Sequence, residues 1–320
     1  MSLLPGVMVM SSTMRQHARW VPYFFLAPFL GVFLVFIAYP MALSASMAFQ
    51  QNAGPGVSEP VGFKNFTWMV QDPAFWTAVK NTTIFAAASV FIQLPASLGL
   101  ALLLNSDRIK ARGLWRMIFF APVLVGLPFV AILAALVFEK NKGLLNVTLN
   151  ALFGFDLEFP WLEVFVMPAL IIAAFWMYVG FNMIYFLAAL QNVNKDLLEA
   201  AQVDGANAWH RFRNVTLPAI KPVAAFVVLL SLIGSFQLFE LPYLMLGGGG
   251  TENRGLTLVM YLYQQGFDRG DLGYASAVGW VLAAVLFGFA IVQRITQSYV
   301  QQTAVNPSMG TKSCEGQNGL

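Results

Sequence analysis

Three polar side chains recur on one face of an otherwise apolar stretch, residues 164–190. Tyr178, Asn182 and Tyr185 are spaced i, i+4 and i+7, which places them along one side of a helix. Their phenol and amide groups can bond the hydroxyl groups of a sugar, and their rings can lie against its apolar face. The same groups could instead lock one helix to another, since such polar contacts are worth roughly 0.6–2 kcal/mol. The sequence leaves both roles open.

A second polar stripe is predicted in the apolar stretch 223–246. Gln237, Glu240 and Tyr243 follow one another at intervals of three residues, which predicts one slanted stripe on a helix. Glu240 is unusual, because an ionisable group inside an apolar span is costly and generally faces a cavity or a partner. It is therefore predicted to bind a solute, with a structural ion pair as the alternative.

A polar segment with a pattern of its own, residues 195–218, separates these two stretches. Asp196, followed three residues later by Glu199, resembles a capping box and predicts a short helix over about 197–203. The two alanines that follow Glu199 leave a shallow face that another backbone could approach closely. The pattern favours a docking segment over the alternative, a solvated connector between spans.

A break and a second short helix are predicted in the second half of this segment. Gly205 ends the first helix, because glycine reaches conformations that strain other residues. Trp209 and Phe212 are three residues apart, so they share one face of the second helix, which starts near Ala206. Pro218 is expected to prevent that helix from continuing into the next apolar stretch.

The elements that position these residues are predicted to be membrane spans. The chain is 58% hydrophobic and only 10% charged, against about 25% charged in an ordinary soluble domain. Six apolar stretches approach or exceed the length of about 20 residues that crosses a bilayer. They lie at 21–46, 82–104, 115–137, 164–190, 223–246 and 274–293. The expected fold class is therefore all-α, a polytopic membrane protein with six transmembrane helices, in which the 195–218 segment is a helical loop between two spans.

The placement of Lys and Arg predicts that both termini are cytoplasmic. With the N-terminus inside, 12 of the 18 basic residues fall in inner segments and 6 in outer loops. This bias explains the mild basicity without a nucleic-acid partner. The expected organisation is a cytoplasmic lead (1–20), a first span with an outer loop (21–76), a five-helix core containing the 195–218 loop (77–298), and a disordered cytoplasmic tail (299–320).

Residue patterns for catalysis or metal binding are not found in the sequence. One cysteine, Cys314, and two histidines, His17 and His210, cannot form a cysteine-based or histidine-rich metal site. The four glycines at 247–250 are not followed by the Gly-Lys-Ser/Thr of a phosphate loop. We expect no enzyme activity and no cofactor on this chain.

The 195–218 segment closely resembles the Glu-Ala-Ala loop of permease subunits in ATP-driven, binding-protein-dependent (ABC) importers. Residues 19–28, 62–66, 112–116 and 273–277 also resemble the sugar-type permeases, those similar to the maltose, lactose and glycerol-3-phosphate importers. The matches extend over about residues 19–298, and the early ones point to the first of the two paired permeases.

The resemblance implies a permease that forms half of the translocation path for a sugar or polyol. Implied partners are a second homologous permease, two ATPase subunits that carry ATP and Mg²⁺, and an extracytoplasmic solute-binding protein. The family's loop residues fall on Glu199, Ala200, Ala201, Asp204, Gly205, Ala206, Phe212, Leu217 and Pro218. We add Trp209, which shares the face of Phe212, to this ATPase-coupling set.

Two departures from the family pattern leave the cargo open. Glu240 stands where the family commonly has Asp, and Gly250 stands where a proline is usual. A permease for another polar metabolite, such as a sugar phosphate, is therefore the alternative. A self-sufficient carrier is a further alternative, although such a carrier should not need the 195–218 loop.

The charge bias gives a direct test of topology, because Cys314 is the only thiol in the chain. A membrane-impermeant maleimide should leave it unlabelled in intact spheroplasts and should label it after lysis. Labelling before lysis would contradict the predicted orientation and the cytoplasmic position of the 195–218 loop.

Overall fold

The computed structural model describes residues 12–52, 58–106, 108–154, 156 and 158–305. These residues are mostly helical, and their only strands are β1 (Gln50–Asn52) and β2 (Ser58–Pro60), which form an antiparallel hairpin. The all-α fold class is therefore confirmed.

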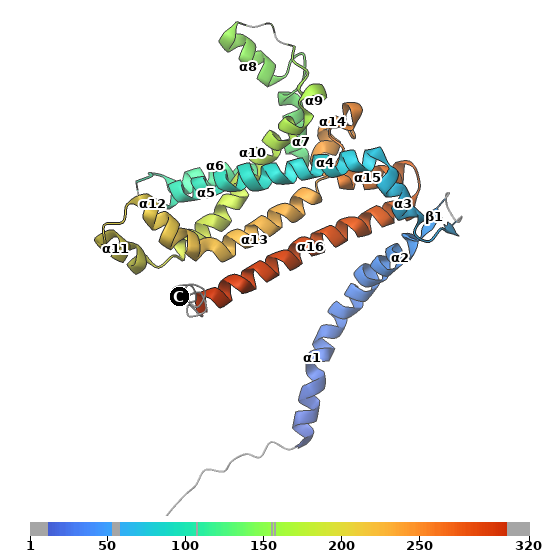
Figure 1. Cartoon of the computed structure of the whole chain (residues 1–320), viewed down its shortest axis with the longest axis horizontal. Helices are drawn as coiled ribbons and strands as arrows, with labels where there is room; N and C mark the ends of the chain where they lie inside the picture. Colours follow the sequence, from blue (N-terminus) through green and yellow to red (C-terminus); the bar gives the residue numbers. More distant parts are fainter. Residues whose placement is uncertain (1–11, 53–57, 107, 155, 157, 306–320) are drawn as a thin grey trace, which may run out of the picture.

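The helices follow one another in the order α1 (Ser12–Phe33), η1 (Leu34–Ala38), α2 (Tyr39–Met47), α3 (Lys64–Gln71), α4 (Pro73–Ala88), η2 (Ser89–Gln93), α5 (Leu94–Asn105), α6 (Arg112–Val125), α7 (Leu127–Val137), α8 (Leu144–Phe153), α9 (Trp161–Val164), α10 (Val166–Gln191), α11 (Lys195–Val203), α12 (Ala208–Arg211), η3 (Phe212–Thr216), α13 (Leu217–Phe236), α14 (Glu240–Leu246), η4 (Thr251–Asn253), α15 (Leu258–Tyr263), η5 (Gln264–Asp268) and α16 (Leu272–Val305). Five continuous helices in the described part are long and apolar enough to cross a membrane, and the bent pair α6–α7 would make a sixth. Figure 1 shows α1 and α2 leading away from the bundle, with α11 and α12 at one end of it and α3 and β1 at the other.

Prolines do not interrupt three of these helices, because a π-helical turn precedes each proline. The turns η1, η2 and η3 end two residues before Pro40, Pro95 and Pro218. In each turn, the residue before the proline donates its N–H to the carbonyl five positions back: Tyr39 to Leu34, Leu94 to Ser89, and Leu217 to Phe212. The wider turn relieves the clash that a proline ring otherwise makes with the carbonyl four residues earlier.

The prediction that Pro218 separates the second short helix from the fifth span is therefore wrong. The α12, η3 and α13 segments form one continuous helix, Ala208–Phe236. This helix ends well before residue 246, the predicted end of the span. A short non-helical link at 237–239 then leads to α14, which is a separate helix.

The third predicted span, 115–137, is bent rather than straight. The axes of α6 and α7 differ in direction by 97°. Gly126 lies between the two helices with φ 93° and ψ 151°, which a residue with a side chain adopts only with strain. Pro128 lies in the first turn of α7, where its missing N–H breaks no helical hydrogen bond.

Other boundaries also differ from the predicted ones. The second span begins at Pro73, nine residues before the predicted start at 82, and α16 continues to Val305. Residues 299–305, predicted to belong to a disordered tail, are therefore helical, while 306–320 lie outside the described residues. At the other end, α1 begins at Ser12, inside the predicted lead.

The central helix of the bundle is α10, which packs against both α5 and α6. Its buried face carries small residues, Ala169, Ala173, Ala174 and Gly180. A Cβ atom at Gly180 would overlap the backbone carbonyl of Phe119 on α6. The two backbones therefore meet directly, which is how helices in membranes gain most from van der Waals packing.

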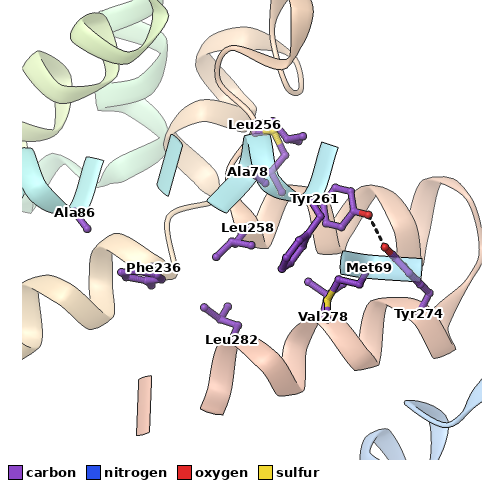
Figure 2. Packing of buried hydrophobic residues seen from close by; sticks show 12 residues of the cluster. Met69, Ala78, Ala86, Phe236, Leu256, Leu258, Tyr261, Tyr274, Val278 and Leu282 are labelled. Carbon is purple, nitrogen blue, oxygen red and sulfur yellow. Dashed lines mark hydrogen bonds between the residues drawn. The ribbon is translucent and has the colours of Figure 1, made fainter. Parts of the chain in front are cut away.

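The end of the bundle near α3 is held by a hydrogen-bonded core that joins α4, α15 and α16 (Figure 2). Tyr261 is almost fully buried, and its hydroxyl donates to Asp72 Oδ2 at 2.6 Å and lies 2.8 Å from the hydroxyl of Tyr274. The other Asp72 oxygen accepts from the backbone N–H of Ala74 at 2.7 Å and so caps α4. The Asp72 carboxylate thus links α4 to α15, and the Tyr261 hydroxyl extends the link to α16.

Gly180→Ala should destabilise the fold, because the added methyl group forces α6 away from α10. We expect a loss of about 1–3 kcal/mol, the usual range for overpacking a tight interface, or more, because the obstacle is backbone. Thermal unfolding in detergent would measure it. Gly288→Ala on α16 is the matched control, since nothing lies within 4 Å of a Cβ atom there. Equal melting temperatures for both variants would contradict the close contact.

Candidate docking loop and solute cleft

The first helix of the loop, α11, starts two residues earlier than predicted. Its N-cap is Asn194, whose side chain accepts a hydrogen bond from the N–H of Asp196 at 2.8 Å. The prediction that Asp196 is the capping residue is therefore wrong. Asp196 lies in the first turn instead, where its negative charge still complements the helix dipole. The helix ends at Val203, as predicted.

The turn after α11 has the hydrogen bonds of a Schellman motif. The N–H of Gly205 donates to the carbonyl of Gln202 at 3.1 Å, and the N–H of Ala206 donates to that of Ala201 at 2.9 Å. Gly205 adopts φ +81°, a conformation that costs residues with side chains free energy. The predicted break at Gly205 is confirmed.

The second helix, α12, has its own cap and is tied to the first. Asn207 accepts from the backbone N–H of His210 at 2.9 Å, a capping role that the sequence analysis missed. Arg211 Nη1 donates to Gln202 Oε1 of α11 at 2.6 Å. The rings of Trp209 and Phe212 lie 5.8 Å apart, which confirms that they share one face.

The loop exposes apolar side chains that a solvated connector would not need. Val203 is 87% exposed, Trp209 63% and Leu197 58%. The remaining residues of the predicted coupling set are exposed or half-buried at the same end of the bundle: Glu199, Ala200, Ala201, Asp204, Gly205, Ala206, Phe212, Leu217 and Pro218. A capped pair of helices, tied together by Arg211 and Gln202, thus exposes both apolar and charged side chains.

The first polar set lies together in a cleft of about 360 Å³ between the spans. Tyr178, Asn182 and Tyr185 all line this cleft, so their predicted common face is confirmed. The side chain of Asn182 is mostly buried. The cleft therefore offers hydroxyl and amide groups beside aromatic rings, the combination that suits a sugar.

Four further polar residues in the cleft were not predicted: Ser89, Gln93, Ser231 and Ser235. The hydroxyls of Ser89 on η2 and Ser231 on α13 lie 2.7 Å apart and link the two spans. Serine in an apolar stretch gives a weak signal, because it is common in transmembrane helices. The nearest sequence signal is Pro95, since the π-helical turn before it carries both Ser89 and Gln93.

The second polar set does not form the predicted stripe on one helix. Gln237 lies just after the end of α13, Glu240 begins α14, and Tyr243 lies one turn further on. All three are exposed, and none lines the cleft. Among the described residues, no ion pair with Glu240 is found.

A family model described as "Binding-protein-dependent transport system inner membrane component" matches residues 93–305. The chain belongs to this family. Its members are membrane components of transport systems, so this permease is a multi-pass membrane protein rather than an enzyme. Among the described residues, no group of three or more His, Cys, Asp or Glu side chains could hold a metal ion.

Curated relatives of this permease extend the match over most of the chain. It is 39% identical to the arabinooligosaccharides transport system permease protein AraP of Bacillus subtilis over 274 residues, which covers 85% of this chain and 86% of the relative. It is 34% identical to the lactose transport system permease protein LacF of Rhizobium radiobacter, with 88% and 95% covered.

Two solved structures have the same fold as this permease. One is a bacterial ABC transporter involved in the import of the acidic polysaccharide alginate, with a TM-score of 0.78, 26% identity and coverage of 90% of this chain and 99% of that one. The other is the alginate transporter in complex with an alginate pentasaccharide-bound periplasmic protein, with a TM-score of 0.75, 26% identity and coverage of 87% and 93%.

Proposed function

We propose that this permease forms half of the translocation path of an ATP-driven importer for a sugar or polyol. The observation that carries the proposal is the continuous helix Ala208–Phe236. Its first turns carry the exposed docking face of the loop, and its later turns line the polar cleft. An ATPase bound to the loop would therefore act on the cleft through a single rigid element.

The proposed importer contains a second, homologous permease, two ATPase subunits and an extracytoplasmic solute-binding protein. ATP and Mg²⁺ bind to the ATPase subunits, and this chain carries no cofactor. Both termini and the 195–218 loop are cytoplasmic in this assembly, which agrees with the bias of basic residues toward the inner segments. The alginate transporter that binds a periplasmic protein supports the presence of a solute-binding partner.

The ATPase binds the loop through its apolar side chains. Burying Trp209, Val203 and Leu197 in a complementary groove removes exposed apolar surface, which stabilises the complex at roughly 25 cal/mol per Å² before the entropic cost of association. The Schellman turn at Gly205 and the link from Arg211 to Gln202 hold the two helices in one shape. Docking therefore requires little reordering of the loop.

The cleft binds the cargo through hydroxyl and amide groups. Asn182, Tyr178 and Tyr185 can exchange hydrogen bonds with sugar hydroxyls, and the exposed Glu240 carboxylate, two residues beyond the cleft-lining Leu238, can accept further ones from the part of the cargo outside the cleft. Relatives whose names specify arabinooligosaccharides and lactose support a carbohydrate cargo. Titrating the purified cognate binding protein with arabinobiose and lactose tests this class, and retention of a non-carbohydrate solute alone would contradict it.

Gly205→Val and Glu199→Lys should uncouple the importer without unfolding it. Valine strains a turn whose φ is +81°, and lysine reverses the charge on an exposed part of the docking surface. We expect normal insertion of the permease and at least a tenfold loss of cargo-stimulated ATPase in the assembled complex, if each change weakens docking by about 1.4 kcal/mol.

Glu158→Lys is the matched charge-reversal control, because Glu158 is exposed and lies outside the loop. It should leave stimulation intact. Normal stimulation in both loop variants would mean that the loop is only a connector.

Glu240→Gln should retain partial uptake, because the amide keeps the size of the side chain and much of its hydrogen bonding. Glu240→Ala removes both and should abolish most of the uptake. Uptake into proteoliposomes measures these effects, and Glu158→Ala is the control. Similar losses in both variants, with poorer recovery of the second permease, would indicate an ion pair with that partner instead. Full uptake by Glu240→Ala would exclude both roles.

A further inference from the structure

Four aromatic rings form a contiguous cluster beside the helix break at 237–239, with two stacked pairs joined by tilted and T-shaped contacts. Phe239 and Tyr243 stack with centroids 5.1 Å apart, and Tyr263 lies 5.1 Å from Phe239 and 5.5 Å from Tyr243. Phe267 then stacks on Tyr263 at 5.1 Å. We call these four residues the aromatic ladder.

The ladder leads from an exposed ring toward the cleft. Phe267 is 69% exposed, whereas Phe239 is partly buried against the core. Phe239 directly follows Leu238, which lines the cleft. The inner end of the ladder is therefore one residue away from the cleft along the chain.

A polar hollow lies close to the ladder along the chain. A hollow of about 490 Å³ lies at the end of α14, lined by Gly247–Gly250, Glu163, Thr251 and Gln264. Gln264 directly follows the ladder residue Tyr263. The ring centroids of Tyr243 and Tyr263 lie 5.5 Å apart, and the carboxylate-bearing Asp268 directly follows the ladder residue Phe267.

Rings with polar groups at their edges match the surface of a sugar, which has apolar faces and hydroxyl groups around them. A face that packs on a partner helix, or on lipid tails, would not need a carboxylate and a polar hollow beside it. Charged groups such as Glu240 and Asp268 are costly in hydrocarbon. The chemistry of the ladder therefore favours a carbohydrate over an apolar partner.

We propose that the aromatic ladder is an entry subsite that holds the trailing sugar rings of an oligosaccharide while its leading ring occupies the cleft. This inference rests on the proposed import function and specifies its substrate class as linked sugars of two or more units. A monosaccharide would occupy the cleft alone and would not reach the outer rings of the ladder. The outer two residues, Tyr263 and Phe267, thereby discriminate between cargoes by length.

The test uses the complete transporter in nanodiscs without nucleotide, with tritiated arabinose, arabinobiose and arabinotriose as probes. Phe267→Leu and Tyr263→Leu remove a ring and keep an apolar side chain, whereas Phe267→Trp keeps an aromatic surface. Phe287→Leu on α16 is the control, since Phe287 is 70% exposed but lies outside the ladder. Binding of each probe and the amount of second permease that co-purifies are measured.

In a double variant that carries both Phe267→Leu and Tyr263→Leu, the loss of aromatic contacts should lower the affinity for arabinotriose about tenfold. The affinity for arabinose should stay the same, and Phe267→Trp and Phe287→Leu should bind all probes normally. Equal losses for all three probes, or loss of the second permease, would make the ladder a packing surface and overturn the proposal. Unchanged binding of arabinotriose would overturn it as well.

These outcomes are separate from failure of the proposed function. If the wild-type transporter binds none of the probes and its binding protein retains no carbohydrate, the sugar cargo itself is contradicted. If the wild-type transporter binds arabinose and arabinotriose equally well, the import function stands and the ladder proposal fails.

Discussion

The structure depends on one constraint: in hydrocarbon, each backbone N–H and C=O group must find a partner within the protein. Prolines at 40, 95 and 218 remove a donor from three spans, and each is absorbed by a π-helical turn in which the preceding residue bonds five positions back. Where the chain turns sharply instead, at Gly126, a glycine with positive φ separates two helices, α6 and α7. Long helices with local irregularities are the result.

The π-helical turn before Pro218 has a mechanical consequence for the proposed importer. A helix that stopped at Pro218 would leave the docking loop hinged to the span, and movement of the loop would be lost in the hinge. Because η3 continues into α13, Trp209 near one end and Ser231 near the other belong to one helix. A displacement imposed on the loop by ATP hydrolysis is then carried to the cleft wall. This continuous helix ends at Phe236, and the non-helical link 237–239 separates it from Glu240 at the start of α14.

The sequence predicts the features that come from local chemistry better than those that come from contacts. The length of apolar stretches predicts the spans, and Gly205 and the spacing of Trp209 and Phe212 predict the shape of the loop. The helix starts were less predictable, because Asp196 and Asn194 are both good caps and only the course of the chain decides between them. Pro218 was misjudged because proline alone does not reveal whether a π-helical turn absorbs it. Ser89 and Ser231 come together across 142 positions, which no local pattern encodes.

The break at 237–239 is stabilised by side chains from distant elements. Thr257 is fully buried, and its hydroxyl donates to the carbonyl of Leu238 at 2.6 Å. The hydroxyl of Thr82 on α4 accepts from the N–H of Leu258 at 3.0 Å and so fixes the segment that carries Thr257. Irregular backbone at membrane depth is tolerated where protein or a water-filled cavity supplies the missing partners. An uninterrupted helix through 237–239 would satisfy its own backbone N–H and C=O groups. The break needs the hydrogen bonds of two buried threonines, Thr257 and Thr82, instead. The break also sets the position of Glu240, an exposed carboxylate that begins α14 two residues beyond the cleft-lining Leu238 and has no basic partner among the described residues.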